Sequence, residues 1–224
     1  MRTRKVALGL YITASFLAVL ATMLGNDILL TLTKPVVIPA ILFYYLAIKR
    51  QQPVSFLLLA VLILNFIGDS IVLLELEDQT TIIMIPYFIA YVILLKFSIE
   101  DVRKMKCHTS GLLLSGFVFC FLMYIMYALI QLFIDTNREL VIPVIIYGIV
   151  LSAFGAIAAY CYYIKNSTFT FYLLMAALLS IVSDVFYMVF SFIFHFPAFH
   201  YFEFAVQLIS YFFMVKYFVL RKNS

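Results

Sequence analysis

Charged residues are scarce in this chain, and tryptophan is missing altogether. Only 12% of its 224 residues are charged and 66% are hydrophobic, whereas soluble domains carry about 25% charged and about 45–50% apolar residues. A soluble fold of this size could not bury so much apolar surface, so much of it is expected to face lipid. The scarcity of charge thus excludes an ordinary soluble protein, and no segment is left for a soluble domain beside the lipid-facing part.

Cysteine is also rare, and its spacing is uninformative. Cys107, Cys120 and Cys161 follow no pattern typical of metal ligands or disulfides, so we expect no metal and no cofactor. Lys216 in the last apolar segment would suit a retinal-binding lysine, but its shallow depth and the absence of tryptophan argue against that role. No A-x-A cleavage site follows the first apolar run, 6–24, so we expect a spanning segment there rather than a signal peptide.

Apolar segments follow one another along the whole chain, separated by short breaks. Because a spanning helix needs about 20 mostly apolar residues, the pattern predicts an all-α polytopic transmembrane bundle with one domain over 1–224. Lys34 and Pro35 interrupt the second segment, and since proline suits the first turn of a helix, we expect that helix to start near Pro35 with Lys34 at its mouth. The eight predicted spans are 6–24, 30–48, 54–74, 80–98, 111–134, 141–164, 168–194 and 199–220.

Basic residues concentrate on one side of these spans. Eleven lie on that side and only Lys34 and Arg138 lie in breaks on the other, which carries most of the acidic residues, among them Glu75, Glu77 and Asp78. Basic loops stay in the cytoplasm, so both termini are expected there, in a multi-pass protein of a bacterial inner (plasma) membrane. The net charge of +4 therefore reflects topology and not nucleic-acid binding. The eleven residues are Arg2, Arg4, Lys5, Lys49, Arg50, Arg103, Lys104, Lys106, Lys165, Arg221 and Lys222.

The two halves of the chain share a short pattern. "KPVVIP" opens the second span and "RELVIP" opens the sixth, and each half carries an aspartate in its third span, Asp69 or Asp184. An internal 4+4 duplication, 1–105 and 106–224, would give a parallel repeat. The spacing from proline to aspartate differs, 30 residues in one half and 41 in the other, so the duplication remains a hypothesis.

Two aspartates lie inside apolar spans. A carboxylate in the membrane costs at least about 2.5–3.5 kcal/mol. Two such residues without a function are therefore not expected. Asp69 and Asp184 both fall in the outer halves of their spans, so we expect them to face one polar cavity. A structural role stays open, with Lys34 holding Asp69 and hydroxyl groups holding Asp184. Polar neighbours at helical spacing are Asn65, Ser180, Ser183, Tyr187, Glu203 and Gln207.

Three dipeptides in the expected order carry a resemblance: Lys34-Pro35 opening the second span, Gly68-Asp69 late in the third, and Ser183-Asp184 in the seventh. With them, the chain resembles the YhhN family of eight-span membrane proteins, which includes the lysoplasmalogenases. The resemblance covers the whole chain. It departs in the fourth span, where relatives often carry a histidine and this chain reads "PYFIAYV" around Tyr87 and Tyr91.

The resemblance implies hydrolysis of the vinyl-ether bond of a lysoplasmalogen to a fatty aldehyde and a glycerophospho-alcohol. Such a bond is cleaved by protonating its β carbon, so one carboxyl must be neutral and the other ionised. We assign the acid to Asp184, which lies deeper, and the ionised role to Asp69 near Lys34; the reverse assignment stays open. Lys34 or Arg138 could also bind the phosphate. The residues expected to bind substrate or tune charge are Lys34, Asn65, Ser183, Tyr187, Tyr91, Glu203, Gln207 and Arg138.

Two other functions compete with the hydrolase. A lipid or small-molecule transporter or binding protein would also have an outward polar cavity, but it should carry polar residues toward both faces, and the inner half has few. An intramembrane aspartyl protease is disfavoured because Phe66 stands where a G-x-G-D motif needs glycine.

Overall fold

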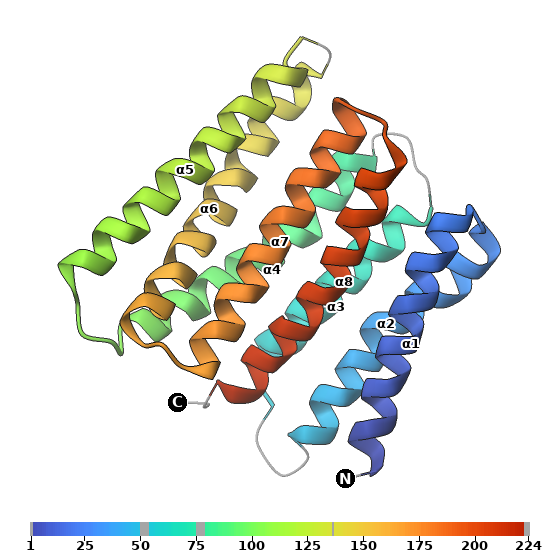
Figure 1. Cartoon of the computed structure of the whole chain (residues 1–224), viewed down its shortest axis with the longest axis horizontal. Coiled ribbons are helices and arrows are strands. Elements are labelled where there is room, and N and C mark those ends of the chain that lie inside the picture. Colours follow the sequence, from blue (N-terminus) through green and yellow to red (C-terminus); the bar gives the residue numbers. More distant parts are fainter. Residues whose placement is uncertain (1, 50–53, 75–78, 136, 222–224) are drawn as a thin grey trace.

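The computed structural model describes residues 2–49, 54–74, 79–135 and 137–221. Within these residues the chain folds into eight α-helices and one short 3-10 helix, with no strand, which confirms the predicted helical bundle (Figure 1). Seven helices are long and apolar enough to cross a membrane, and α3, with 17 residues, is shorter. The helices are α1 (Arg2–Leu24), α2 (Asp27–Ile48), α3 (Phe56–Val72), α4 (Gln79–Val102), α5 (Thr109–Phe133), η1 (Arg138–Leu140), α6 (Val141–Ile164), α7 (Thr168–Phe192) and α8 (Pro197–Leu220).

The start of α2 differs from the prediction. The helix begins at Asp27, not near Pro35, because Asn26 caps it by accepting a hydrogen bond from the backbone N–H of Leu29 at 2.9 Å. Gly25, with φ of 62°, makes the preceding turn. Pro35 and Pro39 therefore lie inside the helix, as membrane helices allow when neighbouring groups satisfy the freed carbonyls.

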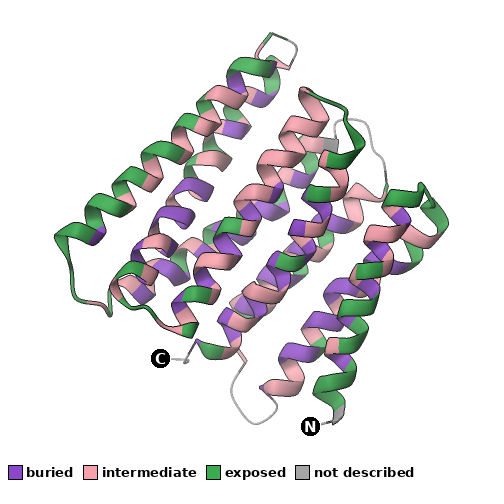
Figure 2. Cartoon of the chain, in the orientation of Figure 1, coloured by how far each residue is buried: buried purple, intermediate pink, exposed green. Residues whose placement is uncertain are grey.

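Consecutive helices pair as hairpins and enclose a buried centre. The hairpins α1–α2, α3–α4, α5–α6 and α7–α8 join through contacts of α4 with α6, α6 with α7, and α2 with α3 and α8. Figure 2 shows buried residues along α8, while α5 turns an exposed face outward. In their most apolar stretches, 56% of α8 is buried but only 6% of α5, so α5 is the helix least restrained by packing.

Several helix–helix contacts of the first four helices recur among the last four, when α1 to α4 are matched in order to α5 to α8. Contacts α1–α2, α3–α4 and α2–α3 correspond to α5–α6, α7–α8 and α6–α7, and α4–α6 corresponds to α8–α2. Among the described residues, the contacts α1–α8 and α5–α7 have no such counterpart, and the 4+4 duplication stays a prediction.

Helix α1 begins and α8 ends at the same end of the bundle, called here the terminal end; the opposite end is the far end (Figure 1). The charge asymmetry predicts that the terminal end is cytoplasmic. Of the residues behind that prediction, Arg50, Glu75, Glu77, Asp78 and Lys222 lie outside the described residues.

Candidate functional site

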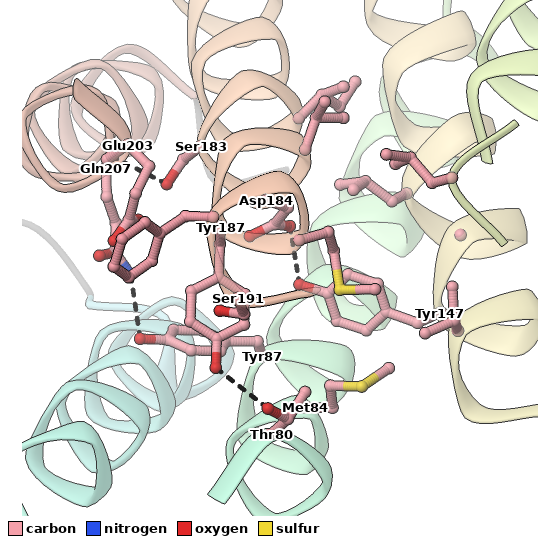
Figure 3. Close-up of a pocket in the computed structure, with 18 of the residues that line it drawn as sticks. Thr80, Met84, Tyr87, Tyr147, Ser183, Asp184, Tyr187, Ser191, Glu203 and Gln207 are labelled. Atoms are coloured by element: carbon pink, nitrogen blue, oxygen red, sulfur yellow. Dashed lines mark hydrogen bonds between the residues drawn. The ribbon is translucent and has the colours of Figure 1, made fainter. Parts of the chain in front are cut away.

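A cavity of about 260 Å³ lies in the half of the bundle nearest the far end, between α4, α5, α6, α7 and α8. One part of its wall is polar and carries side chains from α2, α4, α6, α7 and α8, several of which are labelled in Figure 3. The other part is apolar and comes mainly from α5, α6 and α7. The polar wall consists of Lys34, Thr80, Tyr87, Tyr147, Ser152, Ser183, Asp184, Tyr187, Ser191, His200, Glu203 and Gln207, and the apolar wall includes Leu122, Ile125, Met126, Leu129, Val144, Leu151, Ile181 and Met188.

Asp184 of α7 lies in the cavity wall where the two parts meet. The Tyr147 hydroxyl of α6 donates a hydrogen bond of 2.7 Å to its Oδ2 atom (Figure 3). The Tyr147 ring is in turn held by Tyr91 of α4 in an edge-to-face contact with 5.6 Å between ring centroids. Asp184 is therefore fixed in direction and remains accessible from the cavity, as a group that delivers a proton must be.

Asp69 of α3 occupies a different position. It is 4% exposed and does not line the cavity. Its Oδ1 atom accepts hydrogen bonds from the Tyr87 hydroxyl at 2.7 Å and from Gln207 Nε2 at 3.2 Å, and its Oδ2 atom accepts one from the Tyr211 hydroxyl at 3.0 Å. The expectation that both aspartates face one cavity is thus met by Asp184 alone, because three donors from α4 and α8 enclose the Asp69 carboxylate.

Tyr87 and Gln207 connect Asp69 to the cavity. Both side chains line it, both donate to Asp69, and Gln207 Nε2 also donates to the Tyr87 hydroxyl oxygen at 3.0 Å (Figure 3). Asp69 therefore contacts the cavity wall through these two side chains, without lining the cavity itself.

Lys34 is buried, not at the mouth of a helix. Because α2 starts at Asp27, Lys34 lies seven residues inward, about 10 Å at a rise of about 1.5 Å per residue. Its Nζ atom sits 4.9 Å from the centre of the Phe204 ring. Among the described residues it forms no ion pair within 4 Å, but it interacts electrostatically with Asp69 and Glu203. One buried cation thus attracts two carboxylates.

Helix α8 contributes Glu203, which lines the cavity and is 6% exposed. Its Oε1 atom lies 3.0 Å from Nδ1 of His200. Ser183, the residue before Asp184, donates a hydrogen bond of 3.1 Å to the backbone carbonyl of Glu203 and so ties α7 to α8. Tyr187, the remaining predicted residue of α7 in the wall, shares a 3.2 Å hydrogen bond with Thr80 of α4.

Three further predicted site residues lie away from the cavity wall. Asn65 is buried and donates to the carbonyl of Val61 in its own helix at 2.7 Å. Tyr91 does not line the cavity, but it contacts the Tyr147 ring and is a hydrogen-bond partner of Asp184. Arg138 is exposed in η1 and does not line the cavity. The cavity therefore brings together Lys34, Ser183, Asp184, Tyr187, Glu203 and Gln207, but not Asp69, Asn65, Tyr91 or Arg138.

Of the tyrosines that bind the two aspartates, the sequence analysis assigned only Tyr91. Tyr87, Tyr147 and Tyr211 each donate to a carboxylate, but in a chain with 16 tyrosines nothing in their spacing separates them from packing residues. It also missed a polar cluster at the terminal end, where Arg221 binds both Glu100, at 2.6 Å, and Asp101, at 3.2 Å. That cluster does not line the cavity.

Gly68 provides the space that the Tyr87 ring occupies. A Cβ atom on Gly68 would come within 2.6 Å of Tyr87 Cζ, so Gly68→Ala should push the ring away from Asp69 and lower the free energy of unfolding by about 1–3 kcal/mol. Thermal denaturation in detergent measures this. Gly116→Ala in α5 is the matched control because nothing lies within 4 Å of its Cβ position; equal melting temperatures for the two variants would contradict the packing argument.

In the part of the chain that the structure describes, no three histidine, cysteine, aspartate or glutamate side chains gather where they could hold a metal ion. The candidate site thus consists of hydroxyl, amide, carboxyl, amino and imidazole groups beside an apolar wall.

Comparison with known proteins gives one match. The model of the YhhN family matches residues 29–218, which include α3 to α7 and nearly all of α2 and α8. The matched region contains every residue of the polar wall. Neither the comparison with curated proteins nor that with solved structures gave a match. Because the family model covers most of the chain, this multi-pass membrane protein belongs to the YhhN family.

Proposed function

We propose that this protein is a membrane-embedded hydrolase that cleaves the vinyl-ether bond of lysoplasmalogen-type lysophospholipids, releasing a fatty aldehyde and a glycerophospho-alcohol. One observation carries the proposal: a single cavity joins a half-buried carboxyl group, Asp184, to an apolar wall from α5, α6 and α7. A lysoplasmalogen likewise has one apolar chain and one polar head group, and its vinyl-ether bond lies at the boundary between them.

The chemistry assigned to Asp184 is general acid catalysis. Its carboxyl proton is transferred to the β carbon of the double bond, and the ether oxygen stabilises the resulting cation as an oxocarbenium ion. The carboxylate left behind lies beside that cation and attracts it. The Tyr147 hydroxyl, at 2.7 Å, holds the carboxyl group in position through both stages.

Lys34 and Glu203 suit the two charges of a phospholipid head group. Lys34 is the only lysine or arginine among the cavity-lining residues that the structure describes, and Glu203 supplies a carboxylate from α8. A phosphate near Lys34 and an amine near Glu203 would each meet an opposite charge. Asp69 supports this wall from behind by orienting Tyr87 and Gln207 and by balancing Lys34.

A transporter without chemistry is the competing function. It needs a polar path that continues from the cavity toward the terminal end. The polar residues Asp101, Tyr217 and Arg221 at that end bind one another and lie outside the cavity wall. Of the cavity side chains deepest toward that end, Leu122 and Ile181 are apolar and Ser152 and Gln207 are polar, but none of them joins the cavity to the Asp101 cluster. The geometry therefore supports the hydrolase more than the transporter. We place the enzyme in a bacterial plasma membrane with both termini in the cytoplasm.

The decisive experiment uses purified protein in detergent or nanodiscs with a lysoplasmalogen, and detects fatty aldehyde by mass spectrometry. Aldehyde should form from the vinyl ether but not from the matched saturated ether, which has no double bond to protonate. If the protein bound the vinyl ether but released no aldehyde, the hydrolase would be overturned and the function of a binding protein would stand.

The apolar wall should set the accepted chain length. Leu122 of α5 lines the cavity toward the terminal end, so Leu122→Trp should exclude the end of a long chain. Loss of burial for two methylene groups, at about 0.8 kcal/mol each, lowers kcat/KM for a long-chain substrate about tenfold relative to a short-chain one. Phe121→Trp is the control, because the neighbouring Phe121 is 54% exposed on the outside of α5. An unchanged ratio in Leu122→Trp would place the chain elsewhere.

A further inference from the structure

His200 and Glu203 form a pair in the cavity wall that the proposed acid does not account for. His200 Nδ1 lies 3.0 Å from Glu203 Oε1, and both side chains line the cavity. The imidazole ring stacks on Phe190 of α7 with 4.9 Å between centroids and 17° between planes. The His200 side chain is 35% exposed while that of Glu203 is 8% exposed, so the pair consists of an accessible imidazole and a buried carboxylate behind it.

This geometry determines which imidazole nitrogen is free. A carboxylate accepts hydrogen bonds and donates none, so Glu203 selects the tautomer of His200 that carries its proton on Nδ1. The unprotonated Nε2 then remains as an acceptor on the other edge of the ring. A base oriented by a buried carboxylate is the arrangement that recurs wherever histidine removes a proton from a hydroxyl group or a water molecule.

We propose that His200 is the general base of the hydrolysis and that Glu203 is its positioning residue; this rests on the proposed function. Asp184 and His200 come from adjacent helices, α7 and α8, and line the same cavity. Ser183, next to Asp184, donates to the backbone carbonyl of Glu203 at 3.1 Å, which couples the position of the acid to that of the base. Asp69 does not reach the cavity wall, so the second proton-transfer group comes from α8.

The proton balance of the reaction closes with these two groups. Asp184 gives its proton to the β carbon, and the electron pair of the carbon–carbon double bond forms the new C–H bond. Water adds to the adjacent carbon of the oxocarbenium ion while His200 Nε2 takes one proton from that water, which yields a neutral hemiacetal and an imidazolium ion. The hemiacetal hydroxyl then returns a proton to Asp184, the C–O bond to glycerol breaks, and the imidazolium protonates the departing oxygen.

Kinetics in the aldehyde assay test this division of roles. His200→Gln should lower kcat about 100-fold, as loss of a general base does, and leave KM within about twofold, because the base does not hold the substrate. Glu203→Gln should lower kcat less, about tenfold, since the imidazole stays but loses its fixed tautomer, and it should also raise KM, because the charge that faces the head-group amine is lost. His195→Gln is the matched control: His195 also contacts the Phe190 ring, with 6.1 Å between centroids, but does not line the cavity, and its kcat should equal that of the wild type.

Deuterium exchange in D2O separates a base from a merely structural histidine. Without the base, water adds to the oxocarbenium ion more slowly, so the ion can return to the vinyl ether by losing a proton. Substrate recovered from His200→Gln should therefore carry deuterium at the β carbon. Substrate recovered from the wild type and from His195→Gln should carry little. Added imidazole should restore part of the kcat of His200→Ala.

The outcomes distinguish the two proposals. A wild type that forms no aldehyde overturns the hydrolase and the base together. An active wild type with unchanged kcat in His200→Gln, or with reduced kcat but no deuterium in recovered substrate, leaves the hydrolase standing and overturns the role of His200.

Discussion

Asp184→Asn should nearly abolish aldehyde formation, with kcat lower by about 10²- to 10⁴-fold, the range attributed to a single general acid. Asparagine has almost the same shape as aspartate and can still accept the hydrogen bond that Tyr147 donates at 2.7 Å. It has no acidic proton to give to carbon, so the loss should appear in kcat while the protein remains folded. Initial rates of aldehyde release, normalised to protein that elutes as the wild type does, measure the effect.

Asp101→Asn is the matched control for this variant. Asp101 is also buried and accepts a tyrosine hydroxyl, Tyr217, at 2.6 Å, but it lies at the terminal end and outside the cavity. Its activity per folded molecule should be unchanged. If Asp184→Asn retained a rate comparable to that of Asp101→Asn, Asp184 would be a structural carboxylate and the acid would have to be sought elsewhere in the wall.

Lys34→Met should destabilise the protein by about 3 kcal/mol, because removing one member of a buried group of charges leaves the others uncompensated. Lys34 is 6% exposed and interacts electrostatically with both Asp69 and Glu203. The free energy of unfolding can be compared by chemical denaturation in mixed micelles. Lys96→Met, at an exposed position of α4, should change it by no more than about 0.5 kcal/mol.

A double-mutant cycle separates charge from packing at the same position. If the loss in Lys34→Met comes from an unbalanced Asp69, the pair Lys34→Met with Asp69→Leu should be more stable than the sum of the two single changes requires, by about 0.5–3 kcal/mol. Strict additivity would show that Lys34 and Asp69 do not stabilise one another, and that the two residues serve the cavity independently.

The helices were predictable from the sequence because apolar length alone defines a membrane span. The eight predicted spans overlap α1 to α8, and the seventh and eighth differ from α7 and α8 by no more than two residues at either end. The predicted start of α2, near Pro35, was wrong because it was based on proline alone. Asn26 offers an N-cap and Asp27 a favourable first-turn charge, and together these outweigh the preference for proline near the first turn.

The arrangement of the site was predictable only in part. Helical spacing placed Asp184, Ser183 and Tyr187 on one helix, but whether a carboxylate faces a cavity or a ring of donors depends on which helices pack against it. Asp69 meets Tyr87 from α4 and Tyr211 from α8, and no periodicity within α3 contains that information. His200 precedes Glu203 by three residues in α8, but this spacing alone does not show that both side chains line one cavity, so the sequence analysis did not assign His200 to the site.

The shortness of α3 has a consequence for the lipid around it. Its 17 residues extend only about 25 Å, less than the hydrocarbon thickness of about 30 Å. A bilayer adapts to such a mismatch by thinning locally, at fractions of a kcal/mol per Å. The last residue of α3, Val72, lines the cavity, so the leaflet at the far end should be depressed beside the polar wall. A lysolipid in that leaflet would then meet the site at the depth of its own head group, without being extracted into water.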